Sequence, residues 1–180
     1  MTTWVALLRG VNVNGVTVKS AELGALFRDL GFDSVGTFLA SGNVRFEAEV
    51  GVPQRAPLKV RVEQGLRDRF GYDAWIVLVT LDELRSAVQA FPFDATDEAR
   101  QPYVVFVSDP AVFQELTDAS AQADPVEDPA RAGDGVLYWS PERGRSLDTG
   151  FAKLLARTRY RTSTTTRNLR TLEKIVGVSP

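Results

Sequence analysis

The stretch VGTFLASGNVRFEA, residues 35–48, decides how this chain folds. Two β-rich runs, Val35–Ala40 and Val44–Ala48, flank Ser41-Gly42-Asn43, and glycine with small polar residues between such runs is typical of a β-hairpin. Two consecutive strands are therefore predicted here, and the elements on either side of them set the architecture.

The sequence on each side of this hairpin predicts one strand and one helix. The preceding residues give a strand over Thr3–Leu8 and a helix capped by Ser20, with Leu23, Leu26, Phe27 and Leu30 at helical spacing. The following residues give a helix opened by Pro57 and a continuous apolar strand over Ala74–Val79. The order β-α-β-β-α-β is that of a ferredoxin-like unit.

The second half of the chain repeats this order. A capping box at Thr80 and Glu83 starts a helix, and a linker follows to Pro102. The later elements are a strand over Tyr103–Val107, a helix from Asp109-Pro110, a strand near Val126, a strand over Val136–Trp139, a helix over Phe151–Thr158 and a last helix over Arg167–Val176, with no closing strand assigned. We predict an α+β fold of two ferredoxin-like subdomains from a structural duplication, residues 1–80 and 81–180, plus a C-terminal helix.

Composition limits the chemistry. The 180 residues include 44% hydrophobic and 24% charged residues, as in ordinary globular proteins, and no Cys or His. Thiolate catalysis, disulfides and histidine general bases are excluded, so any catalysis needs other side chains or an oxygen-ligated cation such as Mg²⁺. We predict no metal site and no membrane span, expect a cytoplasmic location, and cannot assign a cofactor or decide whether the protein is an enzyme.

Positive charge is concentrated near the C-terminus. Between Arg143 and Arg170 there are eight Lys and Arg residues and one acid, Asp148, although the whole chain has a net charge of −2. The predicted start of the last helix, Thr165-Thr166-Arg167-Asn168, lies at the end of this tract, and two cations in its first turn, Arg167 and Arg170, oppose the helix dipole. A bound phosphate or carboxylate reverses that effect, which predicts an anion site. The alternative is a threonine N-cap with solvent-facing arginines.

The loop after the first strand, Arg9 to Gly15, is a second candidate for ligand contact. Its glycines allow close backbone approach, Arg9 offers a planar five-donor fork, and Asn12 offers donors and acceptors. The alternative is an ordinary turn-rich connection.

Two further features are interpreted as structural. Ser41 has no histidine to activate it, and we place its turn at the sheet edge opposite the end of the first strand, away from Arg9. The acidic tract from Asp94 to Asp134 has no EF-hand spacing and is interpreted as a solvated face.

The segments LLRGVNVNG (7–15), LGFDSVGTFLASGNVRF (30–46) and TTRN (165–168) together resemble the bacterial domain-of-unknown-function 1697 family. The resemblance implies two ferredoxin-like subdomains in a cytoplasmic bacterial protein, with no established activity. Asn14 stands where the family often has Gly, and Leu169 where a Trp is common.

The leading functional hypothesis is that the protein binds a small anionic ligand, phosphate or nucleotide-like. The residues predicted to hold it are Arg9, Asn12, Thr165, Thr166, Arg167 and Asn168. The alternatives are nucleic-acid binding by the basic C-terminal face, which the sequence pI of 5.3 disfavours, and a protein-interaction module without a ligand.

Overall fold

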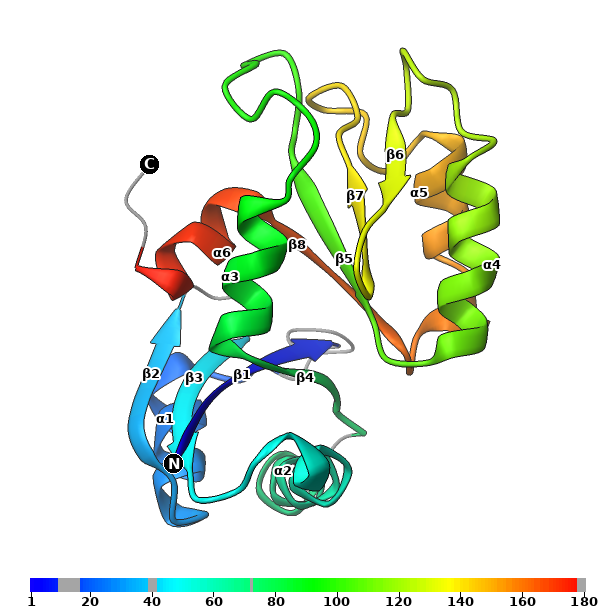
Figure 1. Ribbon diagram of the computed structural model, residues 1–180. Coiled ribbons are helices and arrows are strands. Elements are labelled where there is room, and N and C mark those ends of the chain that lie inside the picture. The colour runs from blue at the N-terminus through cyan, green and yellow to red at the C-terminus, as the bar shows by residue number, and fades with distance from the viewer. Residues whose placement is uncertain (10–16, 39–41, 72, 178–180) are drawn as a thin grey trace. The chain divides into compact units, whose positions relative to one another are not determined.

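A computed structural model describes residues 1–9, 17–38, 42–71 and 73–177 of the chain (Figure 1). The chain divides into two compact units, Met1–Leu84 and Arg85–Pro180. Each unit contains one four-stranded sheet in which all strand pairs are antiparallel.

The first unit has helices on one face of its sheet. Its elements are β1 (Thr2–Arg9), α1 (Ser20–Asp29), β2 (Asp33–Phe38), β3 (Asn43–Ala48), the 3₁₀ turn η1 (Val52–Gln54), α2 (Arg55–Phe70) and β4 (Trp75–Thr80), with strand order β2-β3-β1-β4. Helix α3 (Leu81–Gln89) begins in this unit and ends in the second. Alternate β1 residues, Trp4, Ala6 and Leu8, join the apolar faces of α1 and α2 in one buried core. This alternation is the period-2 pattern of a strand with a helix-covered face.

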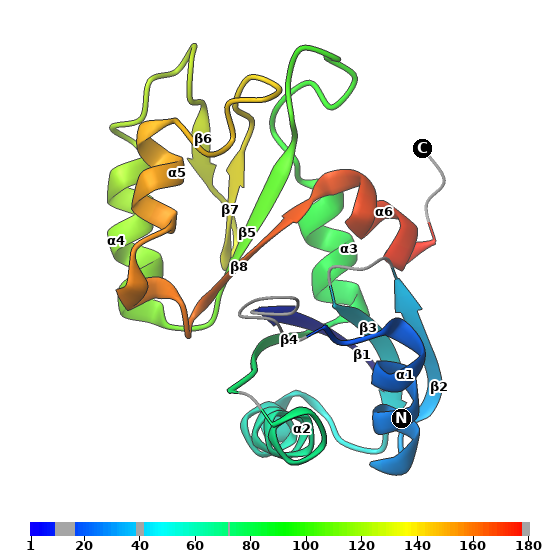
Figure 2. The ribbon, with the colours of Figure 1, turned by 180° about the vertical axis from the view of Figure 1, so that it is seen from behind.

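The second unit repeats the arrangement. Its elements are β5 (Tyr103–Val107), α4 (Pro110–Ser120), β6 (Ala130–Ala132), β7 (Val136–Trp139), α5 (Gly150–Leu155), η2 (Thr158–Tyr160), β8 (Thr164–Asn168) and α6 (Leu169–Val176), with strand order β6-β7-β5-β8. Helices α4 and α5 lie side by side on one face of the sheet (Figures 1 and 2). Their core includes Val105, Leu116, Leu137 and Phe151.

The predicted fold class is confirmed: an α+β protein with two four-stranded antiparallel sheets and a C-terminal helix. The two sheets also share a strand register. Trp4 of β1 pairs with Phe46 and Thr80, and Tyr103 of β5 pairs with Trp139 and Asn168. Thr80 and Asn168 therefore hold equivalent positions, each at the end of a closing strand and directly before a helix.

Two predicted helix starts are present in the structure. Thr80 Oγ1 accepts a hydrogen bond from the Glu83 backbone N–H at 3.1 Å, and Glu83 Oε2 accepts one from the Thr80 N–H at 2.8 Å. This reciprocal pair is a capping box. Burial raises the pKa of Glu83, but hydrogen bonds from Arg55 and Thr80 outweigh it and the pKa is lowered overall. Asp109 caps α4 by accepting from two backbone N–H groups.

Several predicted boundaries were wrong. The last helix begins at Leu169 rather than Arg167, because Thr164–Asn168 pair with β5 as the closing strand that sequence reasoning did not assign. The short strand expected near Val126 is β6, Ala130–Ala132, and Val126 itself is 68% exposed in a loop. These segments lack the hydrophobic periodicity on which the prediction depended.

The predicted position of the β2–β3 turn relative to β1 was also wrong. Strand β3 is the direct neighbour of β1, and the Leu8 N–H donates to the Gly42 carbonyl at 2.8 Å. Gly42 and Asn43, where β3 begins, therefore lie beside the end of β1 and not at the opposite edge of the sheet. Ser41 itself lies outside the described residues.

Candidate functional site

Four of the predicted ligand-binding residues, Thr165 to Asn168, lie on strand β8. In the antiparallel register Arg167 is opposite Val104 and Thr165 is opposite Phe106. Residues two apart on a strand share a face, so Thr165 and Arg167 share the face that carries Val104 and Phe106. Thr164, Thr166 and Asn168 share the other face, which carries the core residue Val105 and is covered by α4 and α5.

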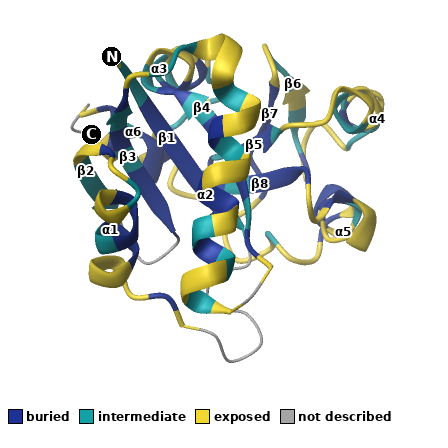
Figure 3. Ribbon diagram, turned by 90° about the horizontal axis from the view of Figure 1, so that it is seen from below, coloured by how far each residue is buried: buried dark blue, intermediate teal, exposed yellow. Residues whose placement is uncertain are grey.

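Arg167 is the buried member of the basic tract. It is 7% exposed, whereas the seven other Lys and Arg residues between Arg143 and Arg170 are exposed. Figure 3 shows β8 among the buried strands. Arg167 Nη1 donates to Thr165 Oγ1 at 2.6 Å and to the Thr166 carbonyl at 3.0 Å. A guanidinium keeps its charge at any ordinary pH, so the chain holds a permanent positive charge in a largely water-free place.

The equivalent strand of the first unit is apolar. Because Thr80 corresponds to Asn168, Val79 corresponds to Arg167 and Val77 corresponds to Thr165. Ile76 and Leu78 stand where the second unit has Thr164 and Thr166. The closing strand is therefore mainly hydrophobic in the first unit, whereas in the second unit it has the sequence TTTRN. Three of these five residues, Thr164, Thr165 and Arg167, are buried.

Two polar side chains of β8 have local structural roles. Asn168 caps α6, since its Oδ1 accepts from the Arg170 backbone N–H at 2.9 Å. Thr164 Oγ1 donates to the Tyr160 carbonyl at 3.0 Å and ties β8 to the preceding turn. Arg170 is the only one of the two predicted first-turn cations that lies in the helix.

The remaining predicted residues belong to the first unit. Arg9 is the last residue of β1, half-buried and opposite Trp75 of β4. Asn12 lies outside the described residues. Asn43, which sequence reasoning treated as ordinary turn chemistry, is fully buried and donates from Nδ2 to the Phe38 carbonyl at 2.8 Å, which closes the β2–β3 connection.

The exposed cations of the basic tract fall into two groups. Arg159 pairs with Glu115 at 3.0 Å, Arg145 lies 3.7 Å from Glu142 and 4.0 Å from Glu127, and Arg143 Nε donates to the Glu98 carbonyl. Lys153, Arg157, Arg161 and Arg170 form the second group, whose side chains make neither an ion pair nor a hydrogen bond with the described residues.

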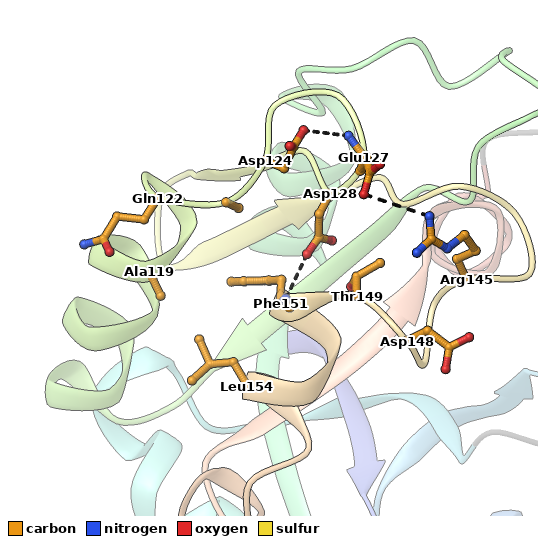
Figure 4. Close-up of a pocket in the computed structure, with 12 residues that line it drawn as sticks. Ala119, Gln122, Asp124, Glu127, Asp128, Arg145, Asp148, Thr149, Phe151 and Leu154 are labelled. Atoms are coloured by element: carbon orange, nitrogen blue, oxygen red, sulfur yellow. Dashed lines mark hydrogen bonds and ion pairs between the residues drawn. The ribbon is translucent and has the colours of Figure 1, made fainter.

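A cavity of about 370 Å³ opens between the end of α4 and the start of α5 (Figure 4). Asp128 organises its wall: this carboxylate is 5% exposed and accepts from Trp139 Nε1 at 2.6 Å and from the Phe151 backbone N–H at 2.8 Å. Asp124 accepts the backbone N–H groups of Glu127 and Val126, which lowers its pKa. Sequence reasoning missed Asp128 because an aspartate in an acidic tract looks solvated.

Among the residues that the structure describes, no three His, Cys, Asp or Glu side chains are grouped so that they could hold a metal ion. No helix of these residues is long and apolar enough to cross a membrane. Burial raises the pKa of the Tyr138 hydroxyl, and the charge of Asp134 adds to this shift.

Comparisons with known proteins give a family and a fold. The sequence model of a protein family described as "Protein of unknown function (DUF1697)" matches residues 1–138. Among solved structures, the conserved bacterial protein SP0830 from Streptococcus pneumoniae is similar over 98% of this chain and 98% of its own, with a TM-score of 0.79 and 22% identity. This likeness shows the fold alone. No curated protein matches the chain significantly.

Proposed function

This chain belongs to the DUF1697 family of proteins of unknown function, and from that premise we propose that it binds a small anionic ligand with a phosphate-like group through Arg167 on β8. The proposal is of binding and includes no reaction step. A cytoplasmic location, expected from the sequence, is part of it.

The observation that carries the proposal is the difference between the closing strands of the two units. Val77 and Val79 show that the topology accepts apolar side chains where the second unit has Thr165 and Arg167. Burying polar and charged groups in such a place costs free energy that hydrophobic residues would not cost. Polar and charged side chains that are kept where the fold accepts apolar ones are commonly retained for function.

The chemistry of the strand favours an oxyanion. A guanidinium presents planar N–H donors that match two oxygens of a phosphate or carboxylate, and such charge-assisted hydrogen bonds are about twice as strong as neutral ones. Because Arg167 is buried, little water competes with an anion for the hydrogen bonds of its guanidinium. The contributions of Thr166, Asn168, Arg9 and Asn12 stay predictions, and alanine variants of each test them one at a time.

The test is a thermal shift experiment with sodium phosphate against sodium chloride at equal ionic strength. Phosphate at about 100 times its dissociation constant should stabilise the folded protein by about 2.7 kcal/mol. We expect Arg167→Met, which keeps the apolar stem and removes the charge, to abolish the phosphate-specific rise in Tm. Arg157→Ala removes an exposed cation of the same tract and should leave the rise intact. Equal responses in the two variants would mean diffuse electrostatics and no site at Arg167.

A second candidate function is sequence-independent binding of a nucleic-acid duplex by α5 and η2. The observation in its favour is that Lys153, Arg157 and Arg161 are exposed and make no ion pair within the described residues. The aromatic residues of this segment, Phe151 and Tyr160, are buried, so base stacking on a single strand is disfavoured and backbone contact is favoured.

Fluorescence anisotropy with a mixed-sequence DNA duplex tests this second candidate. Affinity should fall steeply with salt, and Arg157→Ala and Arg161→Ala should each reduce the slope of log K against log salt by about 1. The matched control is Arg145→Ala, because Arg145 already faces two glutamates. An unchanged slope in all three variants excludes this surface.

A further inference from the structure

We infer that Thr165 is a positioning residue for Arg167 and not itself a ligand contact: its hydroxyl fixes the guanidinium in the orientation that receives the anion. This inference rests on the proposed function and assigns Thr165 a role different from the direct contact that the sequence predicts.

Two hydrogen bonds of Arg167 carry the inference. A single nitrogen, Nη1, donates both to Thr165 Oγ1 at 2.6 Å and to the Thr166 carbonyl at 3.0 Å. Because a guanidinium is planar, two acceptors on one nitrogen restrict rotation of the whole group. Thr165 is 2% exposed and Arg167 is 7% exposed, so little water competes for these bonds.

Packing alone does not require the Thr165 hydroxyl. Val77 occupies the equivalent position of the first unit, and valine has nearly the shape of threonine without the polar atom. Thr164, by contrast, uses its hydroxyl to bind the Tyr160 carbonyl on the helix-covered side of the strand. The hydroxyls of these two neighbouring threonines thus have different partners. The Thr164 hydroxyl binds a backbone carbonyl, and the Thr165 hydroxyl accepts from the buried guanidinium of Arg167.

The consequence concerns affinity. A side chain held in its bound orientation loses less conformational entropy when the ligand arrives, so the free protein is preorganised. Removing the hydroxyl should leave the charge of Arg167 in place but weaken phosphate binding. A serine at position 165 keeps the hydroxyl on a smaller side chain, so Thr165→Ser should bind phosphate nearly as well as the wild type.

Isothermal titration of phosphate into the full-length protein and four variants tests this. We expect Thr165→Val to weaken binding about tenfold, Thr165→Ser to stay within about twofold of wild type, and Arg167→Met to abolish binding. Thr164→Val, the matched control on the other face, should lower stability and leave the dissociation constant unchanged. Chemical denaturation of each variant separates loss of folding from loss of binding.

The four variants distinguish a positioning role of Thr165 from anion binding by Arg167. If Arg167→Met abolishes binding and Thr165→Val does not weaken it, Thr165 is not a positioning residue and the anion site stands. If Thr165→Ser is as weak as Thr165→Val, the methyl group matters and the inference is overturned. If Arg167→Met binds like wild type, the proposed function fails and takes the inference with it.

Discussion

Replacing Asp128 by alanine is expected to lower the free energy of unfolding by about 3–5 kcal/mol. The carboxylate is almost fully buried, and its two oxygens accept the Trp139 indole N–H and the Phe151 backbone N–H. Alanine leaves both donors without a partner, and an unsatisfied buried donor costs about 1–3 kcal/mol. Urea unfolding followed by circular dichroism measures the loss.

Asp148→Ala is the matched control for this prediction. Asp148 lines the same cavity and carries the same charge, but it is exposed and its side chain makes no ion pair within the described residues. Its removal should change stability by no more than about 0.5 kcal/mol. Similar losses in the two variants would contradict the view that hydrogen bonding by Asp128 holds the cavity wall.

The double variant Thr165→Val/Arg167→Val should stay within about 1 kcal/mol of the wild type in its free energy of unfolding and lose the phosphate response. It gives β8 the residues that β4 has at the equivalent positions, Val77 and Val79. Replacing a buried polar pair by well-packed hydrophobic residues is commonly neutral or stabilising, whereas removing one partner alone is not. Urea unfolding and the phosphate thermal shift are measured on the same preparation.

Thr165→Val alone is the control for the double variant. It leaves the guanidinium without its hydroxyl acceptor, so its stability should fall below that of the double variant. A double variant that is less stable than wild type by more than about 1 kcal/mol would show that the polar pair holds the strand in place. Thr165 and Arg167 would then stabilise the fold, and the argument that they are kept for ligand binding at the expense of stability would fail.

Local signals in the sequence predicted two of the helix starts, whereas the N-cap of α1 is Lys19 instead of Ser20 and α2 begins at Arg55 instead of Pro57. The capping box at Thr80 and Glu83 and the cap at Asp109 each involve atoms within three residues, so their geometry follows from the local chain alone. The central hairpin and the apolar strands were predictable for a similar reason, since alternation and turn residues are local properties.

The candidate site was located in the sequence but its local structure was not. Thr165 to Asn168 read as a helix start because threonines precede a run with helical periodicity. They form a strand because β5 offers a free row of backbone donors and acceptors, and such pairing does not depend on side-chain polarity. Only the paired strand shows that Arg167 and Thr165 share a face.

The sequence by itself determined the α+β class, the duplicated order of elements except for the closing strand β8, and the excess of positive charge near the C-terminus. Tertiary structure decided which strands are neighbours, which of eight cations is buried, and that Asp128 has a structural role. The physical reason is the distance along the chain over which each interaction acts. Propensity, capping and periodicity act over a few residues, whereas strand order and the burial of a charge depend on partners tens of residues away, such as Val104 for Arg167.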